Sequence, residues 1–97
     1  MARRLLSVDA TPEYRDASGT VVLAEVQVNL GWVGRRMAAI EGAVGGRIAF
    51  LTRLGEGLVP GHDTVYQEGD LVHLVIRETE LEEAQKRLAA APAEEVH

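Results

Sequence analysis

The sequence that decides the fold is Leu71-Val72-His73-Leu74-Val75-Ile76-Arg77. This run is apolar except for His73, and the Glu68-Gly69-Asp70 segment predicts a turn just before it. A strand with apolar residues on both faces is typical of the centre of a sheet, or of a sheet covered on both sides. We therefore expect residues 71–77 to form a buried strand.

A helix is predicted directly after this strand. Residues 79–82 have the pattern of a capping box, in which the Thr79 hydroxyl accepts a backbone N–H bond and Glu82 reaches back. Pro92 limits the helix at its far end. The apolar stripe that follows at helical spacing consists of Leu81, Ala84, Leu88 and Ala91.

Three further strands are predicted upstream. Residues 20–28 alternate with period two, after a turn at residues 16–19, and residues 47–54 form the second strand. In the second strand we expect Ile48, Phe50 and Leu54 on one face and Ala49 and Leu51 on the other. Leu58 and Val59 begin a return strand, which Pro60 keeps short or at an edge.

The first helix is predicted from a stripe that ends at a glycine pair. Asn29 lies upstream as a candidate cap, and Gly45-Gly46 stops the helix. Residues 7–15, which include Pro12, have no period and are predicted to be an arm or linker. The stripe at helical spacing consists of Val33, Met37, Ile40 and Val44.

These elements predict an α+β fold. The order strand, helix, strand, strand, strand, helix gives a small four-stranded mixed or antiparallel sheet with two helices on one face. A chain of 97 residues holds one domain of this kind. Because two short helices cover one face only, apolar residues such as Ala49 and Leu51 would remain uncovered. A second copy of the chain is the simplest cover, so we expect a homodimer.

Composition excludes several classes of protein. The sequence has no cysteine, which excludes a disulfide scaffold and a thiolate metal site. Its formal net charge of −5 argues against nucleic-acid binding. No apolar stretch is long enough to span a membrane, and the start does not resemble a signal peptide. We therefore expect a cytoplasmic protein that does not insert into a membrane.

Catalytic and metal-binding patterns are not found in the sequence. Its two serines, Ser7 and Ser18, do not lie in a nucleophile elbow. The three histidines, His62, His73 and His97, do not share the spacing of metal ligands on a helix. We therefore expect that the chain is not an enzyme and holds no metal.

One surface is a candidate ligand site. Arg47 and Arg53 bracket a strand face that carries Ala49 and Leu51, and an apolar floor with cationic ends suits a nucleotide. The competing interpretation is that both arginines pair with acidic residues at the rim. The full candidate set is Arg47, Ala49, Leu51, Arg53, Val59, Pro60 and His62.

Several segments, taken in order and spacing, resemble a known family. They are Val21 to Val28, Val33-Gly34-Arg35-Arg36-Met37 with Ile40, Arg47 to Arg53, Val59-Pro60, Asp63-Thr64-Val65 and Gln67 to Val72. Together they resemble the TrkA-C domain, also called the RCK C-terminal domain, over residues 19–89. Met37 stands where the family usually has leucine, and Trp32 is not typical of it.

The resemblance implies a regulatory domain of a potassium or other cation transport system. Such domains form homodimers, follow a Rossmann-like lobe and act on a membrane cation transporter or channel. This sequence does not contain that lobe, so the chain is expected to be a fragment or a stand-alone version. Residues 1–18 would be a connector or disordered arm, residues 19–91 the domain and residues 92–97 a tail.

The resemblance also implies an effector. Some members bind cyclic di-AMP in the dimer cleft, so that molecule or another nucleotide is the candidate, and no cofactor is required. The residues implied are the candidate set given above. The alternative is a purely structural dimerisation module without a ligand.

Overall fold

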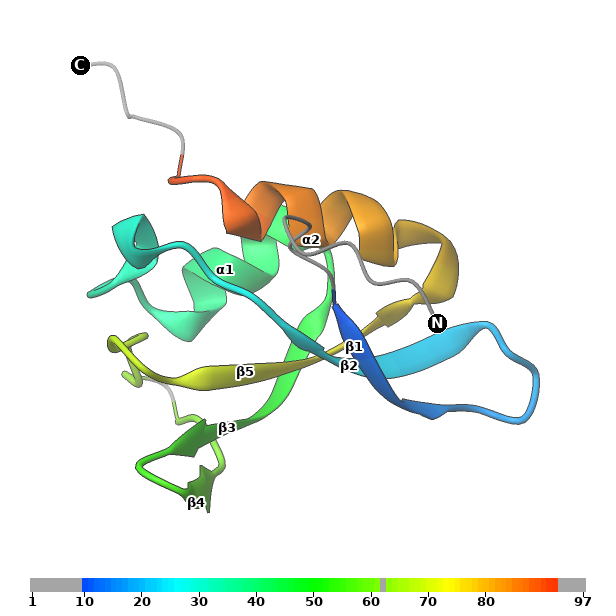
Figure 1. Ribbon diagram of the computed structural model, residues 1–97, viewed down its shortest axis with the longest axis horizontal. Helices are drawn as coiled ribbons and strands as arrows, with labels where there is room; N and C mark the ends of the chain where they lie inside the picture. Colours follow the sequence, from blue (N-terminus) through cyan, green and yellow to red (C-terminus); the bar gives the residue numbers. More distant parts are fainter. Residues whose placement is uncertain (1–9, 62, 93–97) are drawn as a thin grey trace, which may run out of the picture.

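Every strand of the sheet runs antiparallel to its neighbours (Figure 1). The computed structural model describes residues 10–61 and 63–92. The sheet has five strands in the spatial order β1-β2-β5-β3-β4. The predicted buried strand, β5, lies between β2 and β3, as its two apolar faces indicate. The strands are β1 (Thr11–Arg15), β2 (Val21–Val26), β3 (Arg47–Arg53), β4 (Glu56–Leu58) and β5 (Leu71–Arg77).

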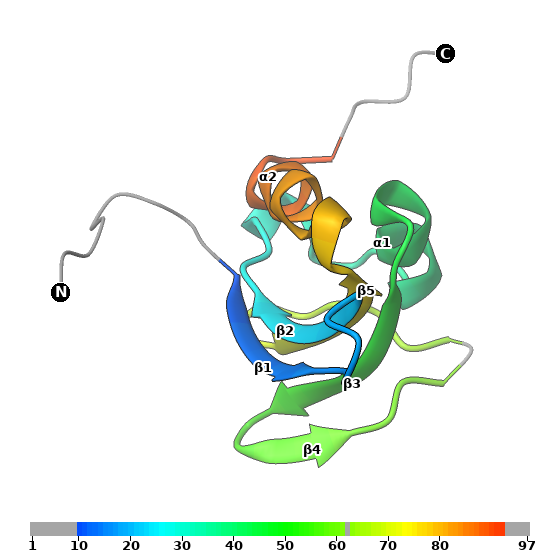
Figure 2. The ribbon, with the colours of Figure 1, turned by 90° about the vertical axis from the view of Figure 1, so that its right-hand side faces the viewer.

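Two α-helices lie on the same side of the sheet, so the predicted α+β class is confirmed (Figure 2). They are α1 (Met37–Val44) and α2 (Leu81–Ala89), and neither is long and apolar enough to cross a membrane. The core lies between the helices and one face of the sheet, which we call the helix-covered face. Its fully buried side chains are Val22, Ile40, Leu51, Val72, Leu74 and Leu88.

The fifth strand, β1, corrects the predicted count of four. Residues 11–15 were expected to be part of an arm, because they show no period and include Pro12. They instead pair with β2 across the turn at residues 16–19, with a bulge between Pro12 and Tyr14. Every residue of β1 is exposed, so an edge strand with no buried face left no periodic signal in the sequence.

A second bulge, in β3, changes which residues share a face. The pairing with β5 shifts between Ile48 and Phe50. An extra residue in one strand interrupts the alternation of faces. Ile48 and Leu51 therefore both point to the core. The prediction that Leu51 lies on the uncovered face is wrong, because Leu51 is 0% exposed.

Leu54 was expected to share a face with Ile48, and this expectation is also wrong. Leu54 lies in the turn between β3 and β4 and is 97% exposed. It has a φ of 54°, the left-handed conformation, and Gly55 follows with a φ of 81°. Successive positive φ values are typical of the two-residue turn that matches the twist of a hairpin.

The ends of the helices differ from the predicted ends. A 3-10 turn, η2 (Glu78–Glu80), leads into α2, and neither element has a side-chain cap. The capping box predicted at Thr79 is therefore wrong. The helix α1 begins at Met37 rather than near Val33, and it ends at Gly45 with a φ of 79°, as the glycine pair predicts.

Asn29 caps a different element from the one predicted. Its side chain accepts a bond from the Gly31 N–H at 2.8 Å and begins the 3-10 helix η1 (Leu30–Trp32). The Asn29 amide also donates to the Ala89 carbonyl, at 3.1 Å, and the Trp32 indole donates to the Ala90 carbonyl, at 2.8 Å. The segment around η1 thus supplies donors to the free carbonyls at the end of α2.

Candidate functional site

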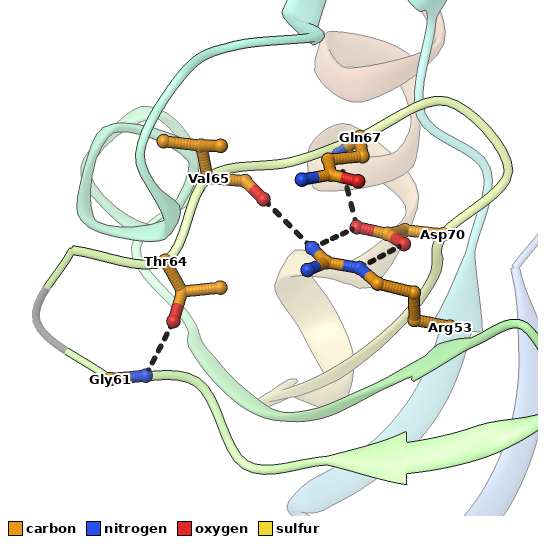
Figure 3. A network of polar contacts seen from close by, with 6 residues as sticks. All are labelled: Arg53, Gly61, Thr64, Val65, Gln67 and Asp70. Atoms are coloured by element: carbon orange, nitrogen blue, oxygen red, sulfur yellow. Dashed lines mark hydrogen bonds and ion pairs between the residues drawn. The ribbon is translucent and has the colours of Figure 1, made fainter.

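Arg53 joins the end of β3 to the loop that precedes β5 (Figure 3). Its Nε donates to Asp70 Oδ1 at 2.8 Å, and its Nη2 donates to Asp70 Oδ2 at 2.7 Å. The same Nη2 donates to the Val65 carbonyl at 2.9 Å. This paired geometry is the strong form of an arginine–carboxylate contact. The Arg53 side chain is therefore already engaged on the helix-covered side of the sheet.

The ion pair changes the titration of both partners. The hydrogen bonds from Arg53 hold the pKa of Asp70 below its ordinary value, against the opposing effect of burial. The Gln67 N–H adds to this effect by donating to Asp70 Oδ2 at 3.0 Å. The same contact with Asp70 raises the pKa of Arg53. Asp70 is thus a charged, buried anchor for the loop.

The anchored loop is also tied to the start of α1. The Met37 N–H donates to the Thr64 carbonyl at 3.0 Å, and the Tyr66 N–H donates to the Arg35 carbonyl at 2.8 Å. The Tyr66 side chain is buried, and this burial raises its pKa. On the other side, the Thr64 hydroxyl accepts from the Gly61 N–H at 2.7 Å (Figure 3). The loop is therefore held from β3, β5 and α1 together.

The structure separates the residues of the predicted ligand set. Arg47 pairs with Val75, a residue outside the core, whereas Arg53 contacts Asp70 on the helix-covered side. The two arginines therefore do not lie on the same face of the sheet. For Arg53 the competing interpretation holds, because its side chain forms an ion pair with the acidic residue Asp70. Leu51 lies in the core, as described above.

The other members of the set divide into accessible and undescribed residues. Arg47 and Ala49 are exposed, Val59 is 80% exposed and Pro60 is half-buried. Leu58 pairs with Leu51, so Val59 and Pro60 leave β4 beside the middle of β3. His62 lies outside the described residues.

The opposite face of the sheet, which we call the open face, is not covered by a helix in residues 10–61 and 63–92 (Figure 2). Cross-strand partners share a face, so the pairs Leu23 with Val75 and Phe50 with His73 lie on it. Its apolar side chains range from half-buried to exposed, with Leu71 at 41%. They are Tyr14, Val21, Leu23, Phe50, Leu71 and Val75.

A polar network on the open face was not predicted. His73 Nδ1 lies 2.9 Å and 3.0 Å from the two carboxylate oxygens of Glu13, and His73 Nε2 lies 2.9 Å from the Thr52 hydroxyl. Phe50 stacks on the imidazole with 4.0 Å between ring centroids. The one sequence signal was a histidine inside the otherwise apolar strand. Its partners come from the bulge of β1 and from β3, where only tertiary structure places them.

Comparison with known proteins gives a curated relative and a solved structure of similar fold, although no family model matches the sequence. The chain is 45% identical over 95 residues to the Trk system potassium uptake protein TrkA of Streptomyces coelicolor. The match covers 98% of this chain and 43% of that protein, so the chain spans less than half of its relative.

The fold has a solved counterpart. The crystal structure of the GsuK RCK domain superposes with a TM-score of 0.66 at 21% identity, covering 88% of this chain and 20% of that one. The likeness in fold and the identity with TrkA agree with the segments that carry the resemblance. The chain belongs to the family of TrkA-C domains, also called RCK C-terminal domains.

Proposed function

We propose that the chain is a non-catalytic regulatory domain of a potassium transport system. The observation that carries the proposal is its 45% identity, over nearly its whole length, to a potassium uptake protein. The fold, which is similar to that of an RCK domain, supports the same conclusion. The domain acts by binding and by changes of geometry.

The relative's greater length suggests the surroundings of the domain. We place it in the cytoplasm, with residues 19–91 as the regulatory domain and residues 92–97 as its tail. Residues 1–18 connect it to a Rossmann-like lobe, and the assembly acts on a membrane cation transporter or channel. Because Thr11–Arg15 forms β1, part of this connector is itself a strand of the sheet.

Homodimerisation through the open face is the second part of the proposal. This face carries apolar side chains that the helices leave uncovered, including Val21 at 36% exposure and Leu71 at 41%. Burial of apolar surface contributes about 25 cal/mol per Å². A second copy of the chain, meeting the same face, covers both sets of side chains in one symmetric contact.

Sedimentation velocity at tens of micromolar tests the dimer. We expect the native chain to sediment as a dimer and Leu71→Glu to shift it towards monomer, because a carboxylate would be buried without a partner. Val33→Glu is the matched control, since Val33 has a similar exposure of 45% but lies beside η1, outside the sheet. A monomeric native chain, or an unchanged Leu71→Glu dimer, would contradict this interface.

An anionic effector such as cyclic di-AMP or another nucleotide is the third part. The accessible members of the predicted set are Arg47, Ala49, Val59 and Pro60. Arg47 is the one arginine among them, so we propose that it contacts the phosphate and that the base lies on the other three. We exclude Arg53 and Leu51 from the proposed effector site, because Arg53 is bound to Asp70 and Leu51 is buried.

Calorimetry with cyclic di-AMP, ATP and NADH tests the effector site. Loss of one charge-assisted hydrogen bond costs roughly 1.5–3 kcal/mol, so Arg47→Ala should weaken binding at least about tenfold. Arg87→Ala, an exposed arginine on α2, should bind as the native chain does. Equal binding by the native chain and Arg47→Ala would show that the site lies elsewhere.

A structural dimerisation module without a ligand remains the second candidate. The observation that favours it is the engagement of Arg53, which leaves Arg47 as the accessible arginine of the set. If none of the three nucleotides binds the native dimer at up to millimolar concentration, the structural module replaces the effector proposal. The dimer test is independent of that result.

A further inference from the structure

The polar network on the open face also holds the edge strand β1. Glu13 lies at the β1 bulge, between Pro12 and Tyr14, and the register shift there leaves it without a strand partner. Its carboxylate instead bonds His73 of β5, which in turn bonds Thr52 of β3. Because β1 pairs with β2 alone in the described sheet, the Glu13 side chain spans β2 to reach β5. The network is therefore a side-chain tie between β1 and the centre of the sheet.

The next residue of β1, Tyr14, extends the open face onto this edge strand. Tyr14 lies opposite Leu23 of β2, and Leu23 lies opposite Val75 of β5, so the three side chains form one row across the sheet. Tyr14 is 65% exposed, more than Val21 or Leu71 on the same face. Tyrosine is enriched at protein interfaces, because its ring is apolar and its hydroxyl is polar. The open face thus ends at β1 in a large, accessible aromatic side chain.

Apart from the tie, β1 has few contacts that hold it in place. All of its residues are exposed, and Pro12 has no N–H to donate to a strand ladder. The Arg15–Glu78 ion pair, at 3.7 Å, has both side chains about half exposed, and such pairs contribute little to stability. Segments with little buried surface open locally at a low free-energy cost. β1 therefore has two states, docked on β2 and detached from it, that a partner can bias.

The charges of the open face fit a second copy of the same face. Glu13 and Glu25 lie on β1 and β2, whereas Arg77 and Arg47 lie on β5 and β3. A symmetric contact presents the same surface twice, so the acidic part of one copy can face the basic part of the other. A uniformly acidic or basic partner would match only half of this face. We therefore take a second copy of the chain as its occupant.

We infer that β1 is part of the dimer surface, so that docking of β1 on the sheet and binding of the second copy strengthen each other. The inference rests on the dimer of the proposed function and adds its regulation. In the docked state Tyr14 stands on the face that the partner covers, whereas in the detached state this contact is lost. Two events linked in this way change each other's equilibrium by the same factor. The connector that contains β1 is thus held more firmly in the dimer than in the monomer.

Amide hydrogen exchange on the whole chain, followed by NMR over a range of protein concentrations, tests the coupling. The protection of the Glu13, Tyr14 and Arg15 amides is compared with that of α2, which lies on the other side of the sheet (Figure 2). We expect the protection of β1, relative to α2, to rise at least about fivefold as the dimer forms. In Leu71→Glu, which is expected to be monomeric, the protection of β1 should not rise with concentration.

Two variants of β1 show whether this strand supplies the coupling. Tyr14→Ser should weaken the dimer at least about fivefold in sedimentation equilibrium. Leu30→Ser is its matched control, because Leu30 is 61% exposed but lies in η1, outside the sheet. Glu13→Ala removes the tie, so it should lower the protection of β1 about threefold or more at low concentration. Glu82→Ala, at an exposed position of α2, should leave the protection of β1 unchanged.

The outcomes separate this inference from the proposed dimer. A native chain that dimerises while the protection of β1 stays constant overturns the inference and leaves the dimer standing. A Tyr14→Ser dimer as tight as the native one does the same. A native chain that stays monomeric at every concentration overturns both. Native-like protection of β1 in Glu13→Ala would contradict the role of the tie.

Discussion

Arg53 and Asp70 form an ion pair that also holds the loop before β5 in place. Asp70 is held by both Nε and Nη2 of Arg53, and the Asp70 side chain is 1% exposed. Removing one partner of such a pair leaves the other with unmet hydrogen bonds in a partly desolvated site. The loop at residues 63–67, whose Val65 carbonyl and Gln67 N–H bond to this pair, has a weaker tie to β3 at the same time.

Asp70→Asn should therefore destabilise the fold by about 2 kcal/mol at neutral pH. Because the pKa of Asp70 is lowered in the folded state, its contribution is complete above the ordinary carboxyl range. The contribution declines as the pH falls through the lower, native pKa. Urea unfolding from pH 7 to pH 3 should show the gap between native and variant shrinking below about pH 4.

The control for this prediction is Glu68→Gln. Glu68 is exposed and lies two residues from Asp70 in the same turn, so its removal changes the local charge without breaking the ion pair. We expect its stability to stay within about 0.5 kcal/mol of native. A gap between native and Asp70→Asn that stayed constant over the whole pH range would contradict the assignment of the effect to the carboxylate.

Leu54 adopts a backbone conformation that its side chain disfavours. A left-handed leucine costs roughly 1–2 kcal/mol, whereas asparagine tolerates this region better. Its 97% exposure means that no buried contact is lost on replacement. Leu54→Asn should therefore raise the free energy of unfolding by about 0.5–1 kcal/mol, measured by thermal and urea denaturation.

Val59→Asn is the comparison for that gain. Val59 is also largely exposed, but it does not have a positive φ. Replacing it should change stability by less than about 0.5 kcal/mol. An equal gain in both variants would point to a general effect of surface polarity rather than to relief of the turn.

At the level of elements, two glycines give opposite predictions. A Cβ on Gly46, between α1 and β3, would lie 2.8 Å from the Val75 carbonyl oxygen and 3.2 Å from Ile76 Cβ. Gly42, inside α1, has open space around it. Gly46→Ala should destabilise by about 1–3 kcal/mol through overpacking. Gly42→Ala should stabilise by about 0.5–1 kcal/mol, because glycine is a poor helix former.

Differential scanning calorimetry on both variants checks this pair. The same chemical change is made at two positions, so the sign of the shift in Tm isolates the surroundings of each glycine. A gain from Gly46→Ala would mean that Gly46 and β5 are further apart than the structure has them.

A second pair of predictions concerns two residues at the ends of helices, Asn29 and Thr79. Asn29 caps η1 and also bonds the end of α2, whereas Thr79 lies in η2 without a side-chain cap. Asn29→Ala should cost about 1 kcal/mol or more, and Thr79→Ala less than about 0.5 kcal/mol. Urea midpoints distinguish them. A larger loss for Thr79→Ala would restore the capping box that the sequence pattern predicts.

For the whole molecule, the apolar pattern was sufficient to predict the layers. The strands β2, β3 and β5 and the two helices were predicted from the spacing of their apolar residues, and β5 was expected at the centre because both its faces are apolar. The strand β4 has no buried residue, and it ends at Leu58, where the return strand was expected to begin. The strand β1 was missed because none of its side chains is buried. A buried face requires apolar residues at regular spacing, so a strand that is exposed on both faces does not produce an apolar period in the sequence.

The candidate site was harder to predict than the layers. One inserted residue in β3 moved Leu51 into the core and placed Arg47 and Arg53 on different sides of the sheet. A bulge has no fixed sequence signature. A prediction from strict alternation therefore places every residue beyond the bulge on the wrong face of the strand. The network of Glu13, His73 and Thr52 joins residues as many as 60 positions apart, which no local pattern connects.

The position of β5 has a consequence for how the chain assembles during synthesis. The strands made first pair as two separate hairpins, β1 with β2 and β3 with β4, and β2 has no pairing with β3. Only β5, whose residues emerge last among the strands, joins the two hairpins into one sheet. A ribosome-bound chain that ends before residue 71 therefore lacks the strand that joins β2 to β3, and the edges of these two strands that β5 covers are left open to pairing with the wrong strand.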